Sequence, residues 1–224
     1  MMLEKVGYTY LTPAEAMELR GGNTSNVLLE PILREQLAKI NTVQVSSQRT
    51  TVFSEQNITA GIEALRNLPM AEGFMTASQV AYDLLTAGKT LEQIVDGDKK
   101  SYVMQYIDWK HIENNAFHVT EEFAVSRTGM SDTYRPDIVL FVNGIPLCVI
   151  ECKRPDIKDS LKQAISQHLR NQKEDGIRSL YVYSALLLAT NVNEVSYATT
   201  ATPEKFWSKW TEQFADKNAE ELYR

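Results

Sequence analysis

The stretch RPDIVLFVNGIPLCVIECKRP, residues 135–155, decides the fold of this chain. Two apolar runs flank Asn143-Gly144, a dipeptide typical of a tight turn between antiparallel strands. Three ionisable residues, Asp137, Glu151 and Lys153, stand where these runs begin and end. Charged groups beside a core hairpin need a metal ion or a partner that satisfies them. The stretch therefore predicts a β-hairpin with a polar site at its open end.

The residue types at this open end favour a divalent-metal site for phosphodiester hydrolysis. This reaction requires an activated water and compensation of the charge on the phosphate oxygens. Magnesium keeps several waters, so one or two carboxylates and a backbone carbonyl are enough to hold it. We expect Mg²⁺, or Mn²⁺ in its place, on Asp137, Glu151 and the carbonyl of Cys152. Lys153 shares a strand face with Glu151, where it would orient or deprotonate the water.

The pairing register of the hairpin tests this site. In an ideal two-residue hairpin, counting outward from the turn places Asp137 opposite Ile150. Glu151 would then point to the other face, and the site would be broken. The site therefore predicts either a longer loop with an odd number of residues or a β-bulge near Ile145-Pro146, where proline has no N–H for the ladder.

The order of Pro-Asp, hydrophobic strand and Glu-x-Lys resembles the PD-(D/E)xK nuclease superfamily. The sequence of 135–155 is similar to that of the amino-terminal endonuclease domain of the restriction (motor) subunit of type I restriction-modification enzymes. The segments YDLLTAGK (82–89), IDWKHIENNAFHVTEEFAV (107–125) and LYVYSALLLATN (180–191) also resemble this domain. The resemblance covers about residues 25–200. It implies that Asp137, Glu151 and Lys153 are catalytic, and that double-stranded DNA is cut non-specifically when the motor stalls.

Two interpretations from different classes remain open. The first is an active, magnesium-dependent endonuclease domain. The second is a nuclease-fold module that docks or couples the motor to the methyltransferase core. A structural salt-bridge cluster is the alternative for the three charged residues. The Pro-Asp dipeptide alone decides nothing, because Pro155-Asp156 is a second one that no Glu-x-Lys follows.

The resembled family also carries a Gln-x-x-x-Tyr motif on the helix after the Glu-x-Lys strand. Here Gln167 and Asn171 occupy these positions, one helical turn apart, so asparagine stands where tyrosine is usual. A role for this pair in DNA contact or coupling is therefore in question, and simple packing is the alternative. Arg135, Arg154 and Lys158 are further candidates for DNA contact.

Superfamily members often add an acidic residue from the first core helix. Glu30 is the candidate here, because Pro31 suggests that a helix begins near it. A carboxylate also suits the positive end of the helix dipole, so an ordinary first-turn glutamate is an equal alternative.

Composition and charge limit the function of the chain. Its 224 residues, 43% of them hydrophobic, suffice for one well-packed domain. No apolar run approaches a membrane span and no secretory signal opens the chain, which favours a cytoplasmic protein with no membrane partner. A net charge of −6 lacks the basic footprint of an autonomous DNA binder. We therefore expect other parts of a larger complex to deliver the DNA.

The resemblance names these parts: ATP-driven translocase lobes after the nuclease domain, and methyltransferase and specificity subunits. The chain has no Gly-x-x-x-x-Gly-Lys-Ser/Thr phosphate loop, so ATP is expected to bind only in the full-length subunit. We expect an extension at 1–24, an endonuclease domain at 25–200 and a helical linker at 201–224 that leads to the missing lobes.

The expected architecture is α/β, with a restriction-endonuclease-like core of helices around a mixed central sheet. The sequence predicts helices at 13–19, 26–40, 57–68, 76–86, 90–95 and 157–169. It predicts strands at 42–48, 102–108, 117–125, 137–142, 147–152, 179–184 and 186–190.

Overall fold

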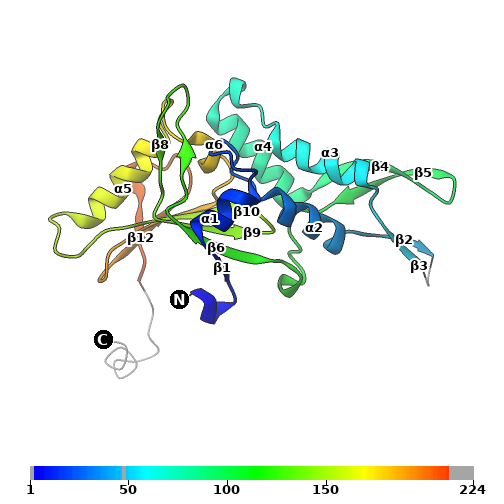
Figure 1. The fold of residues 1–224 in the computed structure, drawn as a ribbon, viewed down its shortest axis with the longest axis horizontal. Coiled ribbons are helices and arrows are strands. Elements are labelled where there is room, and N and C mark those ends of the chain that lie inside the picture. The colour runs from blue at the N-terminus through cyan, green and yellow to red at the C-terminus, as the bar shows by residue number, and fades with distance from the viewer. Residues whose placement is uncertain (1–2, 47–48, 212–224) are drawn as a thin grey trace.

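The central element of the fold is a mixed seven-stranded sheet (Figure 1). The computed structural model describes residues 3–46 and 49–211. The strands follow the order β1 (Thr9–Leu11), β6 (Phe117–Glu121), β9 (Ile138–Val142), β10 (Ile145–Cys152), β11 (Leu186–Thr190), β12 (Val195–Ala198) and β13 (Ser208–Lys209). The pairs β1–β6 and β10–β11 are parallel, and the other neighbours are antiparallel. The predicted α/β class with a mixed sheet is confirmed.

Helices surround this sheet and three short hairpins lie outside it. The α-helices are α1 (Pro13–Leu19), α2 (Glu30–Ile40), α3 (Glu55–Arg66), α4 (Phe74–Ala87), α5 (Ser160–Asn171) and α6 (Arg178–Tyr181), and the 3-10 helices are η1 (Leu3–Val6), η2 (Met70–Glu72), η3 (Ile112–Asn114) and η4 (Glu204–Phe206). The hairpins are β2 (Thr42–Ser46) with β3 (Arg49–Val52), β4 (Lys89–Val95) with β5 (Asp98–Met104), and β7 (Val125–Ser126) with β8 (Thr133–Tyr134). Figure 1 shows β2–β5 at the opposite end of the molecule from α5.

Local sequence signals account for several of these helices. Thr12 caps α1, with its hydroxyl accepting from the Glu15 N–H at 3.2 Å while the Glu15 carboxylate accepts from the Thr12 N–H at 2.8 Å. Ser54 caps α3 by accepting from the Asn57 N–H at 3.2 Å. Among the described residues, no helix combines the length and apolar character that a bilayer crossing requires.

The core forms where α2, α3 and α4 pack beside the central strands. Leu33 and Leu37, one turn apart on α2, have 0% exposure, as do Phe141 on β9 and Val149 on β10. A second, smaller cluster lies under α5, which connects the parallel strands β10 and β11. This connection places one face of α5 against the end of β10, where the predicted site lies.

Three sequence predictions of secondary structure are wrong. The predicted helix 90–95 lies in strand β4: side-chain burial alternates along it, with Leu91, Gln93 and Val95 inward, and Asp96-Gly97 turn the chain back into β5. The predicted strand 179–184 begins as helix α6, since a buried apolar run does not distinguish helix from strand. The described part of 201–224 holds η4 and β13 in place of a helix, and 212–224 lie outside the described residues.

The predicted extension at 1–24 contributes to the main sheet. Its β1 strand pairs in parallel with β6, with Thr9 opposite His118, and the predicted helix 13–19 is present as α1. Both cysteines are free: Cys148 is buried, whereas Cys152 is exposed.

Candidate functional site

The site is built on the β9–β10 hairpin, whose turn and register the sequence analysis put to the test. Asn143 and Gly144 form a two-residue turn with φ of 52° and 80°. The pairing starts with Ile145 opposite Val142, and it shifts between Pro146 and Cys148. The predicted β-bulge near Ile145-Pro146 is therefore confirmed, and the longer loop is not needed.

The bulge decides which face each carboxylate occupies. Beyond it, Ile150 lies opposite Ile138, so the next position along each strand brings Glu151 opposite Asp137. The charge of Asp137 adds to burial in raising the pKa of Glu151. One extra residue in β10 thus restores the arrangement that an ideal hairpin would break.

Asp137 stands at the entrance of this arrangement. Its Oδ2 accepts from the Cys152 N–H at 2.6 Å and lies 3.6 Å from the Lys153 Nζ. The Asp137 and Lys153 side chains are 29% and 20% exposed. Lys153 also donates its backbone N–H to the Thr190 carbonyl of β11, which holds the lysine at the end of the sheet. The acid and the lysine predicted as catalytic are therefore in contact and reachable from solvent.

Glu151 lies beneath them, with 0% exposure. Gln167 donates from Nε2 to Glu151 Oε2 at 2.6 Å, and Asn171 donates from Nδ2 to Oε1 at 3.2 Å. Both amides come from α5, so the two motif positions hold the buried glutamate. Burial, followed by the charge of Asp137, raises the pKa of Glu151 to about 9, against the opposing effect of Lys153.

The residues present fit a magnesium or manganese ion. Two carboxylates share one face, and the buried one is compensated by two neutral amides and by the charges of Lys153 and Arg170. A divalent cation would supply the missing positive charge and lower the pKa of Glu151. Within the described ranges, no three His, Cys, Asp or Glu side chains gather as a metal cluster. This sparse, oxygen-rich donor set suits a hydrated Mg²⁺ better than zinc.

The other predicted residues lie outside the acidic pair. Glu30 is held by Arg34 and Arg66 and lines a cavity of about 520 Å³ that includes neither Asp137 nor Glu151. Its charge is already compensated by two guanidinium groups, so the structure does not bring Glu30 into the metal site. Arg135 pairs with Glu122 at 3.3 Å, Arg154 pairs with Asp156 at 3.6 Å, and Lys158 is exposed before α5.

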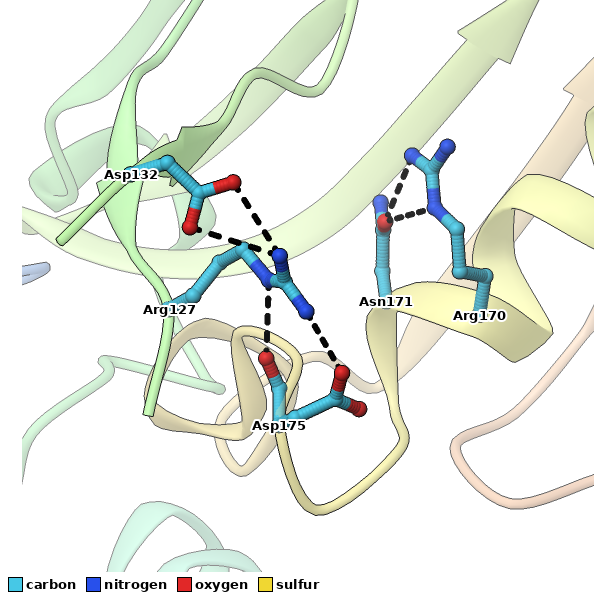
Figure 2. A network of polar contacts seen from close by, with 5 residues as sticks. All are labelled: Arg127, Asp132, Arg170, Asn171 and Asp175. Atoms are coloured by element: carbon cyan, nitrogen blue, oxygen red, sulfur yellow. Dashed lines mark hydrogen bonds and ion pairs between the residues drawn. The ribbon is translucent and has the colours of Figure 1, made fainter. Parts of the chain in front are cut away.

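Sequence reasoning missed two arginines beside the site, Arg127 and Arg170, and Figure 2 shows their polar partners. The Arg127 guanidinium is held by Asp132 at 3.0 Å and Asp175 at 2.5 Å. Both guanidinium groups lie over the Tyr134 ring. The guanidinium carbon of Arg127 is 4.5 Å from the ring centre and that of Arg170 is 4.3 Å from it. The residues come from two distant segments, 127–134 and 170–175, so no local motif could have revealed them.

His168, on α5, is a buried packing residue. Its side chain is 0% exposed and both ring nitrogens have hydrogen-bond partners, Tyr181 Oη and the Leu188 carbonyl oxygen, each at 2.9 Å. Burial lowers the pKa of His168 to about 4, so the ring is neutral near pH 7.

Comparison with known proteins identifies relatives of this chain. A family model described as "Type I restriction enzyme R protein N terminus (HSDR_N)" matches residues 1–206. The chain is 29% identical over 196 residues to the type I restriction enzyme HindI endonuclease subunit of Haemophilus influenzae, covering 84% of this chain and 17% of that protein. It is 25% identical over 198 residues to the type I restriction enzyme EcoprrI endonuclease subunit of Escherichia coli, covering 88% of this chain and 54% of that sequence. The match thus spans about half or less of the length of either relative.

Proposed function

This chain belongs to the family of type I restriction enzyme R protein N termini, and from this premise we propose that it is a magnesium-dependent nuclease domain that hydrolyses double-stranded DNA. The observation that carries the proposal is the β-bulge, which sets Asp137 and Glu151 on one face beside Lys153. A bulge in the middle of a buried strand disturbs the ladder, and here it has a clear consequence for the carboxylates.

Asp137, Glu151 and the Cys152 carbonyl are the proposed holders of Mg²⁺ or Mn²⁺. Such an ion supplies positive charge for the phosphate and an acidic bound water. The Cys152 N–H orients Asp137 through the 2.6 Å bond, while Gln167 and Asn171 orient Glu151. Lys153, 3.6 Å from Asp137, offsets charge on the phosphate and positions or deprotonates the attacking water.

DNA contact is proposed for basic side chains around this entrance. Arg154 and Lys158 follow the site directly, and Arg135 precedes it on the other strand. Their ion pairs are exposed and weak enough to exchange for phosphate contacts. The overall charge of −6 opposes DNA binding by the chain alone. We therefore propose that ATP-driven lobes, with the methyltransferase and specificity subunits, deliver the DNA.

A metal titration tests the proposal. Calorimetry with Mn²⁺ should detect binding to the chain and a loss of binding in Asp137→Ala. The matched control is Asp156→Ala, because Asp156 also follows a proline but is exposed and paired only with Arg154. Asp137→Ala should also abolish DNA cleavage by the assembled restriction enzyme, whereas Asp156→Ala should leave it unchanged.

The same assay separates the second interpretation, a docking or coupling module. If Asp137→Ala leaves cleavage by the assembled enzyme intact, the carboxylates are not catalytic and the nuclease proposal fails. If the isolated chain binds no Mn²⁺ but the variant stops cleavage in the complex, DNA or partner subunits complete the metal site.

A further inference from the structure

A chain of hydrogen bonds extends from the Glu151 carboxylate into the protein interior. Asn171 Nδ2 donates to Glu151 Oε1 at 3.2 Å and lies 3.3 Å from Tyr181 Oη. Tyr181 Oη lies 2.9 Å from His168 Nδ1, and His168 Nε2 lies 2.9 Å from the Leu188 carbonyl oxygen. All four side chains have 0% exposure, so water cannot replace these partners.

The direction of every bond in this chain follows from its inner end. The Leu188 carbonyl only accepts, so His168 must carry its proton on Nε2. His168 Nδ1 then accepts from the Tyr181 hydroxyl, and the hydroxyl oxygen is free to accept from Asn171. A buried Tyr181–His168 pair thus requires an N–H donor on residue 171.

The outer side of Asn171 imposes the same orientation. Arg170 donates to Asn171 Oδ1 from Nε at 3.3 Å and from a terminal nitrogen at 3.0 Å (Figure 2). An arginine has donors only, so the Asn171 oxygen must face it and the amide nitrogen must face inward. The Tyr134 ring, 4.3 Å from the Arg170 guanidinium carbon, supports this position of Arg170.

We propose that Asn171 is a positioning residue for Glu151, and that Tyr181 with His168 on one side and Arg170 on the other set the orientation of its amide. The role of Glu151 as a metal ligand rests on the proposed nuclease function, whereas the hydrogen bonds around Asn171 do not. Neither Asn171 nor Tyr181 touches the phosphate or the attacking water in this scheme. Asn171 stands where the Gln-x-x-x-Tyr motif has its tyrosine. The tyrosine hydroxyl that contacts α5 here is that of Tyr181, which lies on α6 and outside the motif.

The decisive comparison uses two buried tyrosines of the same segment. Tyr183 donates its hydroxyl to the Leu65 carbonyl at 2.6 Å, and among the described residues no hydrogen bond joins it to the carboxylates or to Asn171. Tyr181→Phe and Tyr183→Phe therefore each remove one buried hydroxyl. We expect Tyr181→Phe to weaken Mn²⁺ binding about tenfold, the size of effect that is usual when a residue supporting a metal ligand is lost. Tyr183→Phe should leave the affinity unchanged. Equal affinities for the two variants would overturn the proposal.

A double variant tests whether Tyr181 acts through Asn171. Asn171→Ala should weaken Mn²⁺ binding by at least as much as Tyr181→Phe, and adding Tyr181→Phe to it should cause no further loss. Two losses that multiply would show that Tyr181 acts by another route. Asn171→Gln is the conservative variant, and partial recovery of affinity relative to Asn171→Ala is expected because it keeps the amide.

A measurement without metal separates this proposal from the nuclease proposal. In the metal-free chain, NMR should find the His168 proton on Nε2 and slow solvent exchange of the Asn171 side-chain amide protons. Tyr181→Phe should speed that exchange, whereas Tyr183→Phe should not. If wild type binds no Mn²⁺ but this pattern is found, the isolated chain lacks a complete metal site and the positioning network stands. Fast exchange in wild type, or a proton on His168 Nδ1, would refute the network.

Discussion

The hairpins β9–β10 and β4–β5 have the same kind of turn but different roles. Asn143-Gly144 and Asp96-Gly97 both adopt positive φ, with values of 52° and 80° in the first and 54° and 87° in the second. The β4–β5 pairing continues without a register shift from Val95 opposite Asp98 to Lys89 opposite Met104. The β9–β10 pairing shifts between Pro146 and Cys148. The turn reverses the chain in both hairpins, whereas only the bulge of β9–β10 brings two carboxylates onto one face.

Each hairpin also has a glutamate near a lysine, but Glu92 in β4 is exposed to solvent whereas Glu151 in β10 is buried. Glu92 forms an ion pair with Lys99, and the two side chains are 62% and 61% exposed. Glu151 is fully buried, with amide donors and the second carboxylate of Asp137 around it. A solvated, paired carboxylate needs no further cation, whereas a buried carboxylate beside another one does.

The largest difference between the hairpins should be in metal binding. Glu151→Gln keeps the shape of the side chain but removes a proposed ligand charge, so Mn²⁺ affinity should fall by about 100-fold or more. Glu92→Gln is the matched control and should change the affinity by less than about twofold, since its charge is screened by solvent. Calorimetry on both variants measures this, and similar effects would remove the distinction between the two glutamates.

The two turns should respond differently to the same glycine substitution. A Cβ on Gly144 would lie 2.5 Å from the Leu29 carbonyl oxygen and 3.0 Å from the Leu33 N, whereas a Cβ on Gly97 would meet nothing within 4 Å. Gly97→Ala should cost about 1 kcal/mol for its positive φ. Gly144→Ala should cost about 3 kcal/mol or more, because α2 must also move. Urea unfolding measures both, and equal losses would mean that the close approach of α2 to the turn is unimportant.

Burial at the β9–β10 site should also make stability depend on pH through His168. The pKa of His168 is lowered to about 4 from 6.5, so the unfolded chain binds more protons between these values. The stabilising effect of the neutral ring is present above pH 6.5 and is lost as pH falls toward 4, up to ~3 kcal/mol. Thermal melts from pH 7 to 5 should show a smaller loss for His168→Gln than for wild type. Parallel curves would contradict the buried, neutral histidine.

The sequence predicts the β9–β10 hairpin because its signals are local. Asn143-Gly144 marks the turn, and the charges of Asp137 and Glu151, combined with strand alternation, require a bulge. The β4–β5 hairpin carries an equally local signal, Asp96-Gly97 between alternating residues, which the helix prediction for 90–95 overlooked. In 90–95 the spacing of the few apolar residues fits the helical period as well as the strand period, and the helical period is the wrong one.

Other parts of the site could not be predicted from local sequence. Tyr181 meets Asn171 only through the tertiary fold, and the sequence 179–184 fits a buried strand equally well. Arg127 and Arg170 meet at Tyr134 through tertiary packing alone. Glu30 suits a helix start, but only the fold shows that Arg34 and Arg66 neutralise it. Local patterns thus predict strands and turns, whereas partners of a buried charge depend on the assembled core.

The smallest expected effect on stability concerns Lys99 and Lys153. Lys99→Ala removes an exposed ion pair with Glu92 and should change the free energy of unfolding by less than ~1 kcal/mol. That difference should disappear in 1 M salt, where charges are screened within about 3 Å. Lys153→Ala should also leave stability nearly unchanged, yet DNA cleavage by the assembled enzyme should fall by about 100-fold or more. If Lys99→Ala and Lys153→Ala reduce cleavage equally, the lysine beside Asp137 has no special part in the reaction, and the two hairpins would differ in metal binding alone.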